Sequence, residues 1–147
     1  MKLENKKSKK IVVAVSGYFN PLHVGHLEMI SKAKKLGDYL IAIVNNDEQV
    51  KLKGSVPFMS QTDRLKIVGS LRDVDEVFLS IDKDSTVCAS LRKVKPDIFA
   101  KGGDRNIGNI PETTVCEECA IKIVDGLGKK IRSSSILIKQ ASEKKIC

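Results

Sequence analysis

The sequence of 147 residues has no tryptophan, few other aromatic side chains and no long hydrophobic run. Aromatic residues make up 4% of the chain, which disfavours a surface on which single-stranded nucleic-acid bases would stack. No apolar stretch approaches the length of a membrane-spanning helix, and residues 1–10 lack the apolar segment of a secretion signal. The sequence therefore predicts a cytoplasmic protein with no membrane association.

Cysteine is also scarce, with four residues in all: Cys88, Cys116, Cys119 and Cys147. A structural zinc site takes four ligands, and only Cys116 and Cys119 show the spacing of a ligand pair. We therefore expect reduced thiols in a reducing compartment and no protein-bound metal. A redox role for the Cys116 and Cys119 pair is the weaker alternative.

Positive charge is abundant, with 26 Lys and Arg against 18 Asp and Glu and a net charge of +8. Lysines crowd both ends, so we expect a basic tail over residues 1–10, one domain over 11–141 and a second tail over 142–147. Such a charge balance suits a small anionic substrate better than nucleic acid, since the aromatic side chains that bind bases are few.

Strand and helix patterns alternate along the whole chain. Continuous apolar, β-branched runs predict strands buried on both faces, and helical spacing of apolar residues fills the intervals. The expected strands are residues 11–15, 39–44, 77–79, 97–100 and 121–124; the expected helices are 24–36, 60–71, 85–94, one from Thr113 or Thr114, and 133–140, with a polar loop over 48–59. This order predicts an α/β fold, a single Rossmann-like, doubly wound domain with five parallel strands.

Both histidines, His23 and His26, follow the first expected strand, and ligands in such sheets bind beyond the carboxyl ends of strands. Imidazole can donate a hydrogen bond to phosphate. Gly17 allows a sharp turn, and Gly25 allows the backbone to approach a ligand closely. The pattern predicts a polyphosphate site at a helix start, in preference to two histidines that only cap the helix or pack in the core.

Two further polar clusters follow later strands. Lys101, Gly102, Gly103 and Asp104 come after the fourth, and Arg132 with Ser133, Ser134 and Ser135 opens the last expected helix. The first suits close approach to a nucleotide, although an ordinary turn explains it equally well. The serines and their helix start suit a phosphate. Four other cations are candidates for phosphate contacts, of which the first two could form a lid: Lys51, Lys53, Arg64 and Arg72.

The segment His23-Val24-Gly25-His26 resembles the HxGH signature of the cytidylyltransferase-like nucleotidyltransferase superfamily. The resemblance runs from Ile11 to about Gln140 and includes Leu52-Lys53-Gly54, the stretch from Arg72 to Val77, and the serines 133–135, which match a Ser/Thr-rich signature. It implies attack by a substrate phosphate on the α-phosphate of ATP or CTP, with release of pyrophosphate. Mg²⁺ would accompany the triphosphate, and a homodimer is expected.

The resemblance also implies roles for the candidate residues. His23 and His26, with Lys51 or Lys53, would act in catalysis, and Arg72 and Arg64 would meet the substrate phosphate. The nucleotide-binding residues would be Gly17, Tyr18, Phe19, Asn20, Gly25, Lys101, Gly102, Gly103, Asp104, Arg132, Ser133, Ser134 and Ser135. Lys101-Gly102-Gly103-Asp104 is most similar to heptose-1-phosphate adenylyltransferases. Glycerol-3-phosphate or phosphoethanolamine-type cytidylyltransferases, FMN adenylyltransferases and a non-catalytic nucleotide-binding protein remain alternatives.

Overall fold

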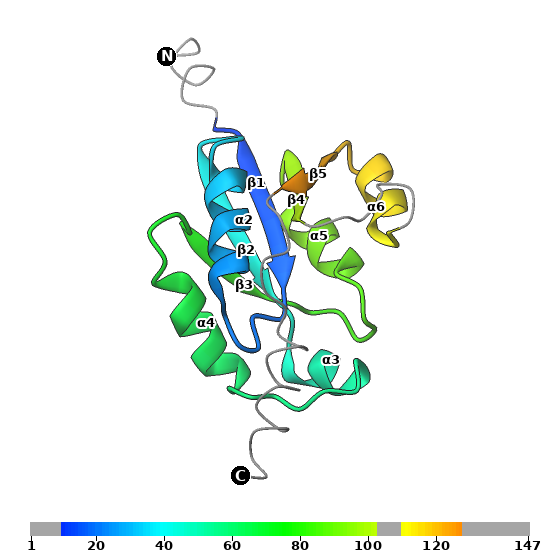
Figure 1. Cartoon of the computed structure of the whole chain (residues 1–147). Coiled ribbons are helices and arrows are strands. Elements are labelled where there is room, and N and C mark those ends of the chain that lie inside the picture. The colour runs from blue at the N-terminus through cyan, green and yellow to red at the C-terminus, as the bar shows by residue number, and fades with distance from the viewer. Residues whose placement is uncertain (1–9, 103–109, 128–147) are drawn as a thin grey trace, which may run out of the picture.

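The computed structural model describes residues 10–102 and 110–127, and within them five parallel strands form one sheet (Figure 1). The strands are β1 (Val12–Gly17), β2 (Tyr39–Val44), β3 (Glu76–Leu79), β4 (Ile98–Gly102) and β5 (Lys122–Leu127). Their order across the sheet is β3-β2-β1-β4-β5. The predicted five-stranded, doubly wound α/β fold is therefore confirmed.

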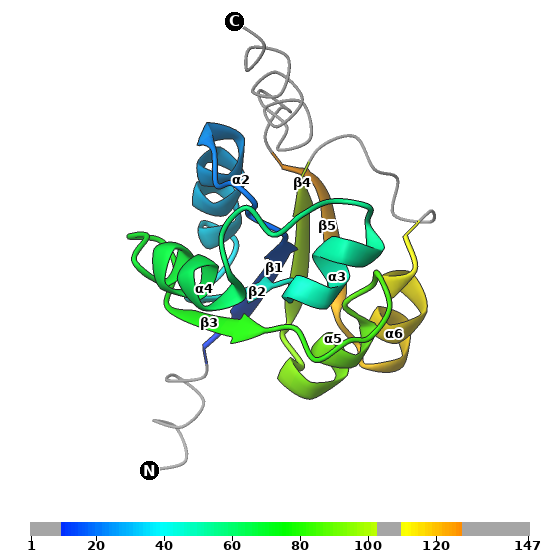
Figure 2. The same cartoon turned by 90° about the horizontal axis from the view of Figure 1, so that it is seen from below.

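Helices cover both faces of the sheet (Figure 2). They are α2 (Val24–Lys34), α3 (Asp47–Leu52), α4 (Gln61–Gly69), α5 (Cys88–Val94) and α6 (Glu112–Glu118). One hydrophobic core joins Ile30 of α2 and Val68 of α4 to the sheet, and a second joins Leu91 of α5 and Val115 of α6 to its other face. Within the described residues no helix has the length and apolar character needed to cross a bilayer.

The strand order reverses between β1 and β4, where chain connections leave in opposite directions. Val13 and Ala14 of β1 pair with Ile98 and Phe99 of β4, while β1 pairs on its other side with the whole of β2. In open α/β sheets ligands bind at this switch, beyond the carboxyl ends of the strands. The loop after β1, which leads to His23, and the end of β4 at Gly102 both open onto it.

The structure corrects the polar loop expected over residues 48–59, because its first part is the helix α3. The Asn46 side chain accepts a hydrogen bond from Gln49 N at 2.9 Å, and Gln49 Oε1 accepts one from Asn46 N at 3.0 Å. This reciprocal cap fixes the first turn of a helix. Gln49 and Val50 are buried, which adds the packing that so short a helix needs.

A second correction concerns α5, which begins at Cys88 and not at Ser85. Its amino end is capped from outside by the buried Asp82, whose carboxylate accepts from Ala89 N at 2.6 Å and Ser90 N at 3.0 Å. By contrast, Ser60 caps α4 as expected, accepting from Asp63 N at 3.2 Å.

Candidate functional site

The loop between β1 and α2 turns sharply after Gly17. Phe19 adopts a left-handed backbone conformation, with φ of 51°, and its side chain is 1% exposed. A Cβ on Gly17 would lie 2.9 Å from the Phe19 ring, so only glycine allows the ring to fold back there. The ring meets His26 edge-on at 4.9 Å between centroids. This packing fixes one histidine against the end of β1.

His23 and His26 together cap the start of α2. His23 is the N-cap, and its Nδ1 accepts from Gly25 N at 3.1 Å, while His26 Nδ1 accepts from His23 N at 3.1 Å. The two rings stack with centroids 3.8 Å apart. Because each Nδ1 is an acceptor, a neutral ring carries its hydrogen on Nε2. The arrangement thus gives two Nε2–H donors at a helix start, a position that favours anions.

The surroundings keep His26 neutral at physiological pH. Burial, followed by the nearby charges of His23 and Lys53, lowers the pKa of His26 from 6.5 to about 3. Burial disfavours the charged ring, and adjacent positive groups do the same. His26 is therefore neutral in this protein, and it would bind an anion through a hydrogen bond and not through a positive charge of its own.

The two candidate lysines differ in their relation to the histidines. Lys53 lies directly after α3, and its ammonium sits 4.2 Å from the centroid of the Tyr18 ring, in the histidine loop. It is also close enough to affect the pKa of His26. Lys51 is 60% exposed and pairs with Glu48 at 3.4 Å. The structure therefore brings Lys53, and not the Lys51 ammonium, to the histidine pair.

Asn20 is buried and fastens the segment 56–59 to the histidine loop. Its Nδ2 donates to Val56 O at 2.8 Å, and its Oδ1 accepts from Phe58 N at 2.6 Å and Met59 N at 3.3 Å. The side chain of Asn20 is thus engaged within the protein, and its effect on a nucleotide would pass through the loop that it holds. The amide supplies both the donor and the acceptor, whereas a carboxylate at this position could only accept.

The expectation that Arg64 meets a substrate phosphate is corrected. Its guanidinium is fully buried and donates to Met59 O at 3.0 Å, Tyr18 O at 2.8 Å and Asn45 O at 2.6 Å. It also pairs with Asp47 Oδ1 at 2.6 Å. Arg64 therefore joins the histidine loop, the end of β2 and the start of α3. Asp47 and Asn45, its partners, are not among the site residues expected from the sequence.

Arg72 is also displaced from its expected place. It lies exposed in the turn between α4 and β3, and this turn enters the amino end of β3, where Glu76 pairs with Ile41 of β2. All five strands are parallel, and the histidines follow the carboxyl end of β1. They therefore lie at the opposite end of the strands from Arg72. Within one chain Arg72 cannot contact a phosphate held by His23 and His26.

Lys101 and Gly102, the first two residues of the cluster expected to bind the nucleotide, lie at the end of β4. Lys101 lies 5.3 Å over the Phe99 ring, and Gly102 is packed so tightly that a Cβ there would be 2.8 Å from Met29 Cγ of α2. Six further candidates lie outside the described residues: Gly103, Asp104, Arg132, Ser133, Ser134 and Ser135, as does the helix expected over 133–140.

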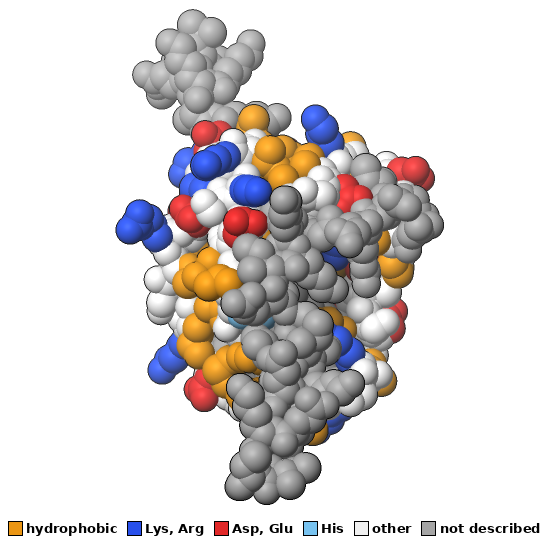
Figure 3. Space-filling view, viewed as in Figure 1, with side chains coloured by type: hydrophobic (Ala, Val, Ile, Leu, Met, Phe, Trp, Pro, Cys, Tyr) orange, Lys and Arg blue, Asp and Glu red, His pale blue; other side chains and the backbone are white. Residues whose placement is uncertain are grey.

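Hydrophobic side chains are exposed around the histidine loop. Val24 and Leu27 on α2, and Val56 and Phe58 in the segment held by Asn20, are between 42% and 74% exposed. Figure 3 shows part of the histidine surface, in pale blue, with hydrophobic surface beside it. The described part of the site therefore combines polar donors with an apolar border.

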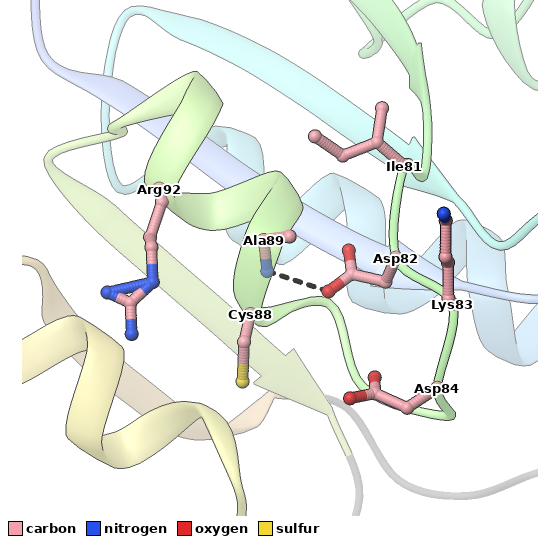
Figure 4. Close-up of a pocket in the computed structure, with 7 residues that line it drawn as sticks. All are labelled: Ile81, Asp82, Lys83, Asp84, Cys88, Ala89 and Arg92. Carbon is pink, nitrogen blue, oxygen red and sulfur yellow. Dashed lines mark hydrogen bonds between the residues drawn. The ribbon is translucent and has the colours of Figure 1, made fainter.

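A hollow of about 510 Å³ lies elsewhere, between the residues after β3 and α5 (Figure 4). Its lining consists of Ile81, Asp82, Lys83, Asp84, Cys88, Ala89 and Arg92. Asp82 points at the start of α5 and is occupied in capping it, and Arg92 pairs with Glu118 at 2.7 Å. Burial raises the pKa of the Cys88 thiol, which makes it less reactive. Of the predicted site residues that the structure describes, none lines this hollow.

Comparison with known proteins agrees with this geometry. Residues 14–140 match the cytidylyltransferase-like family. An FAD synthase of Thermococcus onnurineus is 42% identical over 105 residues, which cover 70% of this chain and 69% of that protein. The bifunctional protein HldE of Nitratiruptor sp. is 38% identical over 82% of this chain, but the matched part is only 26% of HldE.

A solved structure extends the similarity to the fold. The lipopolysaccharide core biosynthesis protein of Thermoplasma volcanium superposes with a TM-score of 0.70 at 29% identity, covering 82% of this chain and 98% of that one. The chain therefore belongs to the cytidylyltransferase-like family, and the enzyme class implied by its HxGH segment, a nucleotidyltransferase, is confirmed. Among its relatives are FAD synthases and part of the bifunctional protein HldE.

Proposed function

We propose that this protein transfers an adenylyl group from ATP to a small phosphorylated acceptor, with release of pyrophosphate. The observation that supports this most directly is the stacked pair His23 and His26, whose Nδ1 atoms both accept backbone hydrogen bonds. ATP is favoured over CTP because both kinds of relative make adenylyl products. CTP is the alternative donor.

In the proposed reaction a phosphate oxygen of the acceptor attacks the α-phosphorus of ATP, and the bond from that phosphorus to the bridging oxygen of pyrophosphate breaks. Negative charge on the α-phosphoryl oxygens and the leaving group is stabilised by donors already in place. The Nε2–H groups of His23 and His26 serve as these donors, and the Lys53 ammonium neutralises phosphate charge. Mg²⁺ enters with the triphosphate, since it binds preferentially through substrate phosphates and water.

The acceptor we propose first is a sugar phosphate of the heptose 1-phosphate type. The sequence Lys101-Gly102-Gly103-Asp104 and the similarity to HldE support it. Since the chain spans about a quarter of HldE, this acceptor is inferred from one part of that relative only.

FMN is a second candidate acceptor. The FAD synthase of Thermococcus onnurineus is matched over most of its length, and the exposed Val56 and Phe58 give the site an apolar border. A flavin ring would bury such a border, whereas a sugar would leave it in water.

Other parts of the proposal concern the remaining nucleotide contacts and the assembly. We propose that Gly103, Asp104, Arg132 and Ser133 to Ser135 complete the nucleotide site, and that the protein acts as a homodimer.

The identity of the substrates is tested by measuring pyrophosphate release with Mg²⁺, with ATP and CTP each offered heptose 1-phosphate, FMN and glycerol 3-phosphate. Release with ATP and one acceptor supports the proposal. Binding of ATP without release for any acceptor would favour a non-catalytic nucleotide-binding protein.

A further inference from the structure

We infer that the aromatic face of Tyr18 is a positioning element for Lys53, holding its ammonium beside the histidine pair where the triphosphate would bind. This inference rests on the proposed function. It assigns Tyr18 a role through Lys53 and not through the nucleotide directly.

The contact itself joins two segments that are far apart in the sequence. Lys53 Nζ lies 4.2 Å from the centroid of the Tyr18 ring, well within the distance at which a cation is attracted to an aromatic face. Tyr18 precedes the buried Phe19, whose ring contacts His26. Consecutive residues of the loop thus place one ring against His26 and the other under Lys53.

The Tyr18 backbone accepts a hydrogen bond from a fully buried side chain. Arg64 Nη1 donates to Tyr18 O at 2.8 Å, and the same guanidinium pairs with Asp47 at the start of α3, the helix that leads to Lys53. Because Arg64 is fully buried, the spacing between the loop and α3 is fixed. Both ends of the Tyr18–Lys53 contact are therefore anchored to one side chain.

Lys53 gains from such a contact because it stands at the end of α3. It is exposed and is the residue that caps the carboxyl end of α3, and Gly54, with φ of 85°, follows it. A lysine side chain loses considerable rotamer freedom when it is fixed, and a site that fixes it beforehand avoids that loss during binding. On the same helix Lys51 is paired with Glu48 and shows no such aromatic contact among the described residues.

Four variants test the inference: Tyr18→Phe, which keeps the ring, Tyr18→Leu, which removes it, Lys53→Met, and the double variant Tyr18→Leu with Lys53→Met. In the proton–carbon NMR spectrum of the protein, the Lys53 ε-methylene signal, assigned by its loss in Lys53→Met, should be shifted upfield by the ring. We expect the shift in the wild type and in Tyr18→Phe, and its loss in Tyr18→Leu. An unshifted signal in the wild type would overturn the inference.

Kinetics provide the second arm, with ATP and the acceptor that supports pyrophosphate release. We expect Tyr18→Leu to lower kcat/KM about tenfold, which corresponds to the loss of one aromatic contact to an ammonium. Tyr18→Phe keeps the ring and should retain most of the wild-type kcat/KM. Tyr18→Leu should have no further effect in the Lys53→Met background, since both changes remove one interaction. A full additional loss there would show that Tyr18 acts independently of Lys53. If the wild type released no pyrophosphate, the proposed function would fail, while the NMR comparison would still decide where Lys53 is held.

Discussion

The imidazole rings of His23 and His26 stack 3.8 Å apart, with their planes 26° from parallel. Their spacing of three residues is that of an N-cap and the third residue of a helix, and each ring accepts a backbone hydrogen bond there. The local structure of the helix start therefore determines which nitrogen of each ring is a donor. The same bonds that begin α2 prepare the pair to bind phosphate.

Acid pH should destabilise the protein through His26. Its pKa is about 3 in the folded protein and about 6.5 for a histidine exposed to water, so the unfolded chain binds more protons between these values. The free energy of unfolding should fall as the pH drops from about 6.5 towards 3, by at most about 1.4 kcal/mol per pH unit from this residue. Urea unfolding at several pH values measures it. In His26→Asn this part of the pH dependence should vanish, and an identical dependence in both proteins would contradict it.

Substitution should destabilise the protein strongly at Arg64 and hardly at Arg72. Arg64→Lys keeps the charge but cannot make the four hydrogen bonds of the guanidinium, so we expect a loss of about 3 kcal/mol or more in unfolding free energy. Arg72→Ala is the control, because that side chain is exposed, and its effect should stay within about 0.5 kcal/mol. Equal losses in urea unfolding would show that the buried hydrogen bonds of Arg64 do not stabilise the fold.

Gly102 should not tolerate a methyl group. In Gly102→Ala the new Cβ would be 2.8 Å from Met29 Cγ and 3.0 Å from Leu127 O, so α2 or β5 must shift, at a cost of about 1–3 kcal/mol. Gly69→Ala is the matched control: at the end of α4 its Cβ meets Val77 at 3.4 Å, and alanine should stabilise that helix by about 0.5–1 kcal/mol. Thermal unfolding of the two variants should move in opposite directions.

Asn20 should be sensitive even to an isosteric change. Asn20→Asp keeps the acceptor for Phe58 N but loses the donor to Val56 O, and we expect a loss of about 1–3 kcal/mol in unfolding free energy. Asn20→Ala removes all three bonds and should cost more. If Asn20→Asp unfolded at the same urea concentration as the wild type, the donor bond to Val56 would be unimportant.

Most of the fold could be predicted from the sequence, because buried parallel strands are continuous apolar runs. Residues 39–44 were placed without error for this reason. The helix α3 was missed because residues 48–59 were expected to form a polar loop, although Asn46 and Gln49 have the spacing of a reciprocal cap. In the site, the histidine pair was identifiable from its glycines and its position after a strand.

The roles of the arginines required the structure. No pattern distinguishes a guanidinium that is fully buried, as in Arg64, from one on the surface. The position of Arg72 was, however, accessible to reasoning: it precedes a strand, whereas ligands bind beyond the carboxyl ends. Lys53 was separable from Lys51 only once α3 placed its ammonium over Tyr18.

The most direct test of the central claim is pyrophosphate release from ATP and the acceptor by His26→Asn. Asparagine can still accept the bond from His23 N through its side-chain oxygen, so the helix start is kept while the Nε2–H donor is lost. We expect kcat to fall about 10²–10³-fold, as for loss of one preorganised donor, while Lys32→Ala on the same helix remains close to wild type. Undiminished release by His26→Asn would contradict the account.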